Sequence, residues 1–417
     1  MGAVSSSVRE YPADAVEFGA WFPNDEACAD YLAWLRWGDY EFVCHLCGAV
    51  ADGWARSDGR RWDCRACGES SSVTSGTLFD KTRTPLSVWF EVAWRMTAET
   101  YGVSARNLHR TLGLGSYQTA WMMLHRFRRA MVVPGREPLN GVVELDTMMV
   151  GGRRPGKRGR YMDENRSVVL VMTENIGKSM LVGSGKSLGR ARLVDVGKWG
   201  GDTLTDAIRD NVALGAMLIS DDDSGIQAAV EAAGDFDYTF ITAKRAADPA
   251  HILFPAVSRV QAQAKRWLES TAQGAASMAH LQDYLHEFEF RFNRRGASKP
   301  GLLFYRLLEQ SVRHVPVTYD IVARSVRMLN RGHHGTQQAH RGRRHPPRDP
   351  RHWTQVPLLR RGHPARRHQV QALRRDAHHS LTPDGRSLHP SHAAGGGTFS
   401  QEKVEPCEVV GLRPAKL

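Results

Sequence analysis

Four cysteines in two matched pairs constrain the fold of this chain more than any other feature. Cys44 and Cys47 form one C-x2-C pair, Cys64 and Cys67 form a second, and 16 residues separate the pairs. This spacing is typical of a structural zinc site, because two tight turns present two sulfurs each to one tetrahedral ion. The sequence therefore predicts a small zinc ribbon over residues 38–84.

A glycine follows the second cysteine of each pair. Gly48 and Gly68 stand where such a turn needs positive φ, which glycine adopts without steric cost. Two disulfides or redox pairs are the alternative, which a cytoplasmic chain disfavours. Cys28 and Cys407 fit no pattern. With four protein ligands, the predicted Zn²⁺ has no open position for catalysis.

The overall composition narrows the class of protein but not the function. The chain has 417 residues, enough for two or three domains. It has no run of about 18 apolar residues and no apolar secretory signal, so we expect a cytoplasmic protein, which argues against transport or secretion. The net charge is +12, yet residues 331–417 hold 16 Lys and Arg against 6 Asp and Glu, and residues 1–330 hold 40 against 38. Prediction of nucleic-acid binding must therefore rest on local sites.

Residues 326–417 form a tail without sustained periodicity. After residue 330 the chain contains 11 of its 18 histidines and 9 of its 19 prolines. The tail is compatible with a disordered basic segment that grips nucleic acid, with a metal-binding tract, or with out-of-frame translation after a frameshift. The abrupt break in a helical region favours the frameshift.

The region before the tail divides by its periodicity into helical and β-rich parts. We expect a helical lead-in over residues 1–37, the zinc ribbon, and a helical segment over 85–135. From residue 141 short β-branched runs alternate with helical patterns, which predicts an α/β domain over 136–325. The expected strands lie at 142–150, 167–173, 179–183, 191–196, 216–221 and 238–243, with a helix over 203–211 and further helices from about 250 to 313.

Residues 103–131 predict two short helices joined by a glycine turn. Ser104 and Ser116 are favourable N-caps, and Gly113 and Gly115 lie between the helices. This pattern fits a helix-turn-helix that binds DNA, and it fits an ordinary helical hairpin equally well. In the first case the second helix presents three residues to base edges and three arginines to phosphates: Tyr117, Gln118, Thr119, Arg126, Arg128 and Arg129.

The segment DYLHEFEFRFNRR, residues 283–295, carries charges close to a packed helical face. Glu287, Arg291 and Arg294 share one face. Its predicted apolar stripe consists of Leu281, Leu285, Phe288 and Phe292. From these residues alone the face is compatible with a solvated ion-pair surface.

Several stretches taken together resemble one family. They are SSVTSGTLFDKTRTPLSVWF, VSARNLHRTLGLGSYQTAWMMLHRFRRAM, VELDTMMVGG and KRWLESTAQGAASMAHLQDYLHEFEFRFNRR. Between about residues 22 and 323 the chain is similar to bacterial insertion-sequence DDE transposases of the ISXO-like branch. The resemblance implies an N-terminal zinc ribbon and an RNase H-like catalytic domain, which is a mixed sheet flanked by helices.

The resemblance also implies a metal-binding triad. The E-x-D motif followed by Gly151 and Gly152 points to Asp146, and the end of a later strand points to Asp221, with Asp222 next. The helix motif implies Glu287 as the third acid, with Arg291 and Arg294 on DNA phosphate. Two Mg²⁺ or Mn²⁺ ions about 3.5–4 Å apart would serve phosphodiester chemistry, and carboxylate oxygens suit such hard ions.

The chain departs from the family pattern at three places. Thr147 stands where the family often has glutamate, Ser258 where it often has histidine, and Glu269-Ser270-Thr271 where Gly-Thr-His is usual. These changes leave the implied triad intact but are compatible with a decayed element. Lys265 is a candidate DNA contact, although an exposed helical lysine usually makes no specific contact.

The resemblance implies a transposase that binds the terminal inverted repeats of its element. Such an enzyme cleaves double-stranded DNA and joins the freed 3′-hydroxyl to a target, and pairing two ends requires a homo-oligomer. Two alternatives remain: a non-catalytic DNA-binding protein derived from a transposase, and a nuclease that cuts DNA without joining it.

Overall fold

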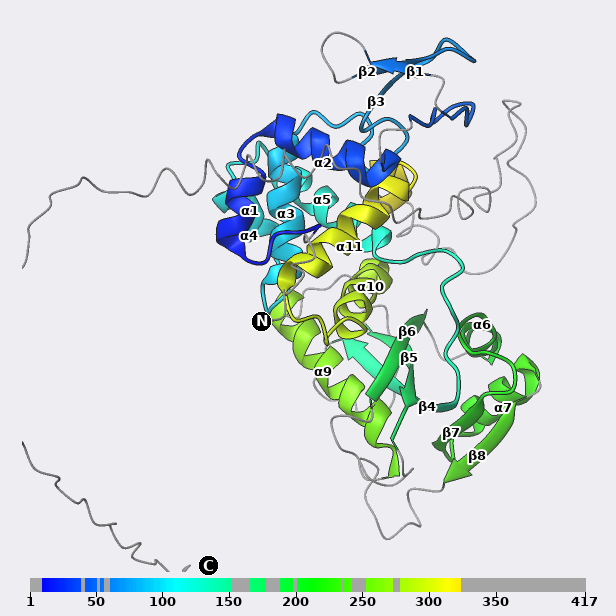
Figure 1. Ribbon diagram of the computed structural model, residues 1–417. Helices are drawn as coiled ribbons and strands as arrows, with labels where there is room; N and C mark the ends of the chain where they lie inside the picture. Colours follow the sequence, from blue (N-terminus) through cyan, green and yellow to red (C-terminus); the bar gives the residue numbers. More distant parts are fainter. Residues whose placement is uncertain are drawn as a thin grey trace, which may run out of the picture. The chain divides into compact units, whose positions relative to one another are not determined.

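The computed structural model describes ten stretches of the chain, all shown as coloured ribbon in Figure 1. They are residues 10–38, 42–50, 53–55, 61–151, 166–177, 188–197, 201–234, 236–241, 253–272 and 278–323. The predicted strand at 179–183 and the tail from 326 lie outside the described residues. Among the described residues, no helix is long and apolar enough to cross a membrane.

The N-terminal region contains two capped helices. Helix α1 spans Ala15–Trp21 and α2 spans Asp25–Trp37, which confirms the predicted helix before the cysteines. The side chains of Asp14 and Asn24 accept hydrogen bonds from the first-turn backbone N–H groups of α1 and α2. Polar N-caps thus start both helices.

Helices from both ends of the described chain share one core. Helix α3 (Leu86–Ala98) and helix α11 (Pro300–Arg313) pack together with α2. Phe18 of α1 stacks on Trp94 of α3, with ring centroids 4.8 Å apart, and its edge meets Phe304 of α11 at 5.5 Å. Helix α11 was predicted within the α/β domain, but its apolar face belongs to this helical core.

The helices predicted over 103–131 are present as α4 (Ala105–Thr111) and α5 (Tyr117–Ala130). The hydroxyl oxygens of Ser104 and Ser116 accept hydrogen bonds from the N–H groups three residues later, as expected of N-caps. Gly113, in the turn, has φ of 59°. The local prediction of caps and turn is therefore confirmed.

Two sheets account for the strands. The small antiparallel sheet contains β1 (Gly53–Ala55), β2 (Arg61–Cys64) and β3 (Ser70–Ser72). The large mixed sheet has the order β6-β5-β4-β7-β8, in which β4, β5 and β6 are antiparallel and β7 and β8 run parallel to β4. Its strands are β4 (Val142–Gly151), β5 (Arg166–Asn175), β6 (Leu188–Gly197), β7 (Met217–Asp221) and β8 (Asp237–Ile241).

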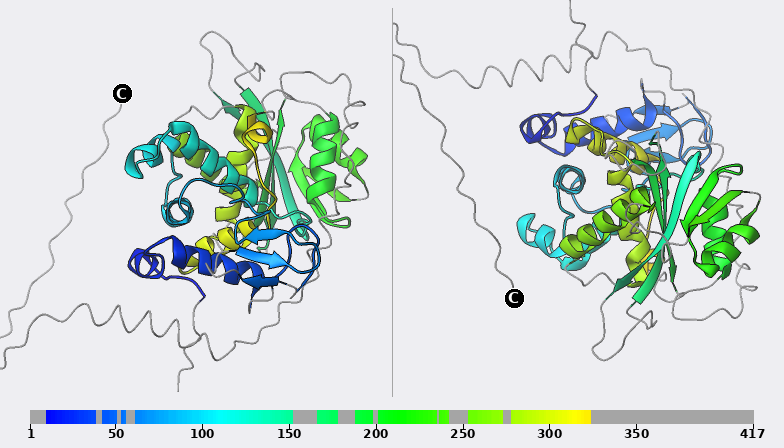
Figure 2. Two further views of the ribbon diagram at one scale, coloured as in Figure 1. Left: turned by 90° about the horizontal axis from the view of Figure 1, so that it is seen from above. Right: turned by 90° about the horizontal axis from the view of Figure 1, so that it is seen from below.

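The large sheet lies between two helix layers (Figure 2). Helices α6 (Gly201–Asn211) and α7 (Ser224–Ala233) cover the face that carries Val143 and Leu145. Helices α9 (Pro255–Ala272) and α10 (Leu281–Phe292) cover the opposite face, which carries Met148 and Ile219. The predicted α/β class with a mixed sheet flanked by helices is thus confirmed.

Helix α10 also closes the free edge of β6. The side-chain oxygens of Gln282, Glu289 and Asn293 accept hydrogen bonds from the backbone N–H groups of Asp195, Leu193 and Ala191, at 2.8, 2.6 and 2.8 Å. These contacts satisfy edge groups that would otherwise be available to another strand. They fix α10 beside β6, at one side of the sheet.

Candidate active site and metal centres

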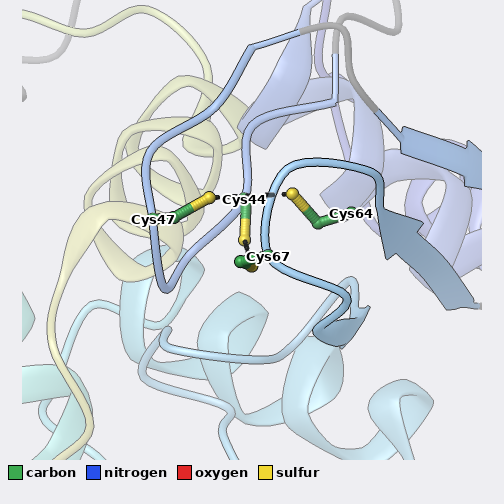
Figure 3. A group of neighbouring side chains, drawn as sticks. All are labelled: Cys44, Cys47, Cys64 and Cys67. Carbon is green, nitrogen blue, oxygen red and sulfur yellow. Dashed lines mark hydrogen bonds between the residues drawn. The ribbon is translucent and has the colours of Figure 1, made fainter.

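The four paired cysteines converge on one point (Figure 3). Their thiols are free, and the sulfurs of Cys44 and Cys67 lie 3.7 Å apart, those of Cys47 and Cys64 3.6 Å apart. Four sulfurs at about 2.3 Å from a central zinc would be separated by about 3.8 Å. The cluster therefore fits a tetrahedral Zn²⁺ and does not fit disulfides.

Each cysteine pair forms the tight turn that the glycines predicted. Gly48 has φ of 75° and donates its N–H to the Cys44 carbonyl at 3.0 Å. Gly68 has φ of 72° and donates to the Cys64 carbonyl at 2.9 Å. Burial opposes ionisation of Cys44, but the N–H groups of Cys47 and Leu46, together with the thiols of Cys47 and Cys67, outweigh it and lower the pKa of the Cys44 thiol to about 7. The lowered pKa favours the thiolate form that binds metal.

Asp146 and Asp221 meet where β4 and β7 run side by side. The register pairs Leu145 with Ser220, so the next residues on the two parallel strands are the two aspartates. Parallel strands are about 4.8 Å apart. Ile219, two residues before Asp221, faces the α9 side, and alternation along the strand places Asp221 on that face too. Both aspartates are only partly buried.

Three consecutive aspartates at the end of β7, residues 221–223, make different contacts. Asp223 is the N-cap of α7, accepting hydrogen bonds from the N–H groups of Gly225 and Ile226. Asp222 is exposed and accepts from the amide of Gln227 at 2.9 Å. The strand register therefore favours Asp221 over Asp222 as the partner of Asp146.

Helix α9 contacts the side chain of Asp146. The Gln261 amide Nε2 donates to Asp146 Oδ2 at 2.9 Å, and the backbone N–H of Thr147 donates to Oδ1 at 2.7 Å. Gln261 was not predicted as a site residue. The two residues are 115 apart in sequence and belong to no common motif, so the sequence contained no signal for this contact.

Glu144, which lies on β4 two residues before Asp146, binds the start of α9. Its Oε2 accepts a hydrogen bond from the Val257 N–H at 2.9 Å, and its Oε1 accepts from the Asn175 amide at 2.8 Å. The residue is 1% exposed, and burial raises the pKa of its carboxyl group. Glu144 and Asp146 are two residues apart on β4 and therefore point to the same face of the sheet. Val257 and Gln261 are about one helical turn apart on α9. The E-x-D motif thus contacts α9 at two successive turns.

Glu287 lies elsewhere, contrary to the predicted triad. Its Oε2 accepts a hydrogen bond from Arg128 Nε of α5 at 2.8 Å, and both side chains are almost wholly buried. Helix α10 follows the outer edge of β6, and the order β6-β5-β4-β7 leaves β5 between β6 and the strand of Asp146. Among the described residues, the three predicted acids do not form one cluster. The structure instead places Glu287 in the contact between α10 and α5.

The two arginines after Glu287 also have structural partners. Arg291 donates to the carbonyls of Met96, Glu99 and Thr100, at 2.8 Å for Met96, and so caps the C-terminus of α3. Arg294 lies over the Phe290 ring, 4.1 Å from its centroid. Arg291 therefore joins α10 to α3, and Arg294 packs on its own helix, so both charges beside the apolar stripe have structural partners. That stripe is buried as predicted.

Asp283 extends the ionic contact between α5 and α10. Its Oδ2 lies 2.7 Å from His125 Nδ1, and its Oδ1 lies 3.4 Å from Arg129 Nε. His125, His280 and Asp283 form the second group of potential metal ligands among the described residues. Trp121 packs against both histidine rings, at 4.3 and 5.0 Å between centroids. The Asp283 carboxylate is therefore surrounded by Arg129 and by the two histidines, against which Trp121 packs.

The predicted DNA contacts separate into exposed and buried residues. Tyr117 and Gln118 are exposed at the N-terminus of α5, Thr119 is half-buried, and Lys265 is exposed on α9. The predicted phosphate contacts are less accessible. Arg128 is buried in its ion pair, Arg129 contacts Asp283, and Arg126 lies over the Trp89 ring at 5.9 Å. Exposed basic residues that we had not predicted occur on α4, at Arg106 and Arg110.

Comparison with known proteins finds a family that is similar to the large sheet and its helices. Residues 138–293 match the family described as ISXO2-like transposase domain. The predicted resemblance to insertion-sequence transposases is confirmed. The matched stretch runs from just before β4 to the end of α10, so it contains the whole large sheet and both helix layers.

A similar protein comes from Halobacterium salinarum. It is described as an uncharacterized protein in transposable element ISH50 and is 30% identical over 145 residues. The alignment covers 34% of this chain and 47% of the relative. The chain therefore spans about half the length of this relative.

Proposed function

We propose that this chain is a DNA transposase whose catalytic centre forms around Asp146 and Asp221. The observation that carries the proposal is the register of β4 and β7, which brings two carboxylates together within the stretch that matches the transposase family. We further infer that the large sheet is an RNase H-like domain. The substrate would be double-stranded DNA at the terminal inverted repeats of the element.

The donor set at this centre fits a hard divalent cation. Asp146 and Asp221 offer carboxylate oxygens on neighbouring strands, which Mg²⁺ and Mn²⁺ prefer over nitrogen or sulfur. When bound, such ions neutralise a phosphate oxygen and promote ionisation of the attacking water or 3′-hydroxyl. The chain itself supplies the fixed positions: a strand for each aspartate, and contacts from Thr147 and Gln261 that orient the carboxylate of Asp146.

DNA recognition is assigned to the exposed helix ends outside the sheet. Tyr117 and Gln118 at the start of α5 are accessible to base edges, and Arg106 and Arg110 on α4 are accessible to phosphates. The proposed Zn²⁺ at the four cysteines would hold the ribbon together. Synapsis of two element ends would require a homo-oligomer.

A second candidate is a DNA-binding protein that no longer cleaves. It is favoured by one observation: Glu287, implied as the third acid, is held by Arg128 away from the two aspartates. This candidate predicts binding to the element ends that is indifferent to Asp146 and Asp221.

Cleavage of labelled DNA from the element ends distinguishes the two candidates. Purified full-length protein with Mg²⁺ or Mn²⁺ should nick these ends. Asp146→Asn and Asp221→Asn should each lower the rate on the order of 10³-fold, equivalent to about 4 kcal/mol of transition-state stabilisation. Asp206→Asn, which alters an exposed carboxylate on α6, is the matched control and should cleave at the normal rate. Binding with no metal-dependent nicking by any variant would establish the second candidate.

A further inference from the structure

We propose that Gln261 supplies the third protein ligand of the catalytic cation, through its amide oxygen. This inference rests on the proposed function and replaces Glu287 in the implied triad. It is carried by the contact between α9 and β4 and by the residues that hold α9 in place.

The Gln261 amide already occupies a ligand position relative to Asp146. Its Nε2 lies 2.9 Å from Asp146 Oδ2. Adjacent ligand atoms of an octahedral ion with bonds of 2.0–2.1 Å are also about 2.9 Å apart. Rotation of the amide about its terminal torsion exchanges nitrogen and oxygen, so the carbonyl oxygen can take the same place without movement of the helix.

Glu144 holds the helix turn that presents Gln261. Its carboxylate binds the Val257 N–H in the first turn of α9, and Asn175 from β5 binds its other oxygen. Gln261 is four residues, or about one turn, further along, and the buried residues Val260 and Ala264 pack into the core beside it. These buried contacts fix the part of α9 from which the Gln261 side chain extends.

No carboxylate on α9 competes for this position. Ser258, Gln261 and Lys265 are spaced to lie along one face of the helix. The sole acid within α9 is Glu269, which is exposed and eight residues beyond Gln261, about 12 Å along the axis. An amide oxygen is a recognised ligand for hard cations, although it contributes no negative charge. The centre should therefore bind its cation more weakly than one with three carboxylates.

Binding of Mn²⁺ to full-length, zinc-loaded protein tests the proposal without relying on activity. Free Mn²⁺ is measured by electron paramagnetic resonance during titration. Gln261→Ala should raise the Kd about tenfold, and Gln261→Glu, which adds a third carboxylate, should lower it about tenfold. Gln263→Ala is the control on the same helix, because a residue two positions away points about 200° around the axis, and it should bind as the unaltered chain does.

The outcomes separate this proposal from the proposed function. If Asp146→Asn abolishes Mn²⁺ binding while both Gln261 variants bind normally, Gln261 is not a ligand and the catalytic centre at the aspartates stands. If Asp146→Asn binds Mn²⁺ normally, or the unaltered chain binds none, the cation site itself is overturned. Tighter binding by Gln261→Glu cannot result from misfolding, so it would support the proposal even if Gln261→Ala proved unstable.

Discussion

Two pairs of acidic residues in the α/β region have different surroundings. Asp146 and Asp221 lie at neighbouring positions of parallel strands, and Asp146 accepts hydrogen bonds from a backbone N–H and an amide. Asp283 and Glu287 lie on α10, where α5 supplies a histidine and two arginines to them. The hydrogen bonds to Asp146 come from uncharged groups, whereas the contacts of Asp283 and Glu287 with α5 include arginines and join two helices. The residue type alone does not distinguish these roles.

Removal of the buried charge on Glu287 should have the largest effect on stability. Glu287→Gln leaves Arg128 buried with its charge uncompensated, so we expect the free energy of unfolding to fall by about 3–5 kcal/mol. Urea denaturation followed by circular dichroism measures the change. The double variant Glu287→Leu with Arg128→Met should recover most of the loss, since it removes both charges together.

Glu287→Gln also tests whether the two acidic pairs have different roles. If Glu287→Gln unfolds at the urea concentration of the unaltered chain but loses metal-dependent nicking, Glu287 acts in catalysis and the two acidic pairs do not differ in role. Asp146→Asn, measured beside it, should show the opposite result: normal unfolding and lost nicking.

The second-largest effect on the free energy of unfolding is expected from acidification, which should weaken the contact between α5 and α10. Burial lowers the pKa of His125 to about 4, with Arg128 and His280 adding to the effect and Asp283 opposing it. Because this folded-state pKa lies below the ordinary value of about 6.5, the unfolded chain binds the proton first, and stability is complete above pH 6.5 and declines toward pH 4. Burial likewise lowers the pKa of His286 to about 4. The loss should approach about 1.4 kcal/mol per pH unit for each histidine.

Urea midpoints at pH 7, 6 and 5 test this sign. His125→Gln should make the dependence shallower, because one of the histidines whose pKa is lowered to about 4 is removed. A midpoint that stays constant from pH 7 to pH 5 would show that these histidines are not buried as neutral groups.

The smallest effect is expected at the aspartates themselves. Without divalent cations, Asp146 and Asp221 repel each other across neighbouring strands, so Asp221→Asn should stabilise the chain slightly, by less than about 1 kcal/mol in EDTA. Added Mg²⁺ should raise the unfolding temperature of the unaltered chain more than that of this variant. A destabilisation of several kcal/mol would instead assign Asp221 a structural role like that of Glu287.

Much of the architecture could be predicted because it depends on neighbours in sequence. The cysteine spacing and its two glycines predict the metal-binding turns, and Ser104 and Ser116 predict the starts of α4 and α5. The apolar stripe of α10 and the alternation of buried residues between the two faces of the strands follow from periodicity. Each of these features is set by hydrogen bonds or side-chain alternation within a few residues.

The division of roles among the charged residues was decided only by tertiary structure. The partners Arg128 and Glu287 are 159 residues apart, and Asp146 and Gln261 are 115 apart. The helical spacing in residues 283–295 predicts a buried face, and it fits the wall of an active site equally well, since both place charged residues beside apolar ones. Sequence therefore determined the local turns, the strands and the two candidate aspartates, while the packing of α5 against α10 decided that Glu287 is held in a buried ion pair, and the packing of α9 against β4 decided that Gln261 contacts Asp146. Electrostatic pairing depends on distance in space, which short-range patterns do not encode.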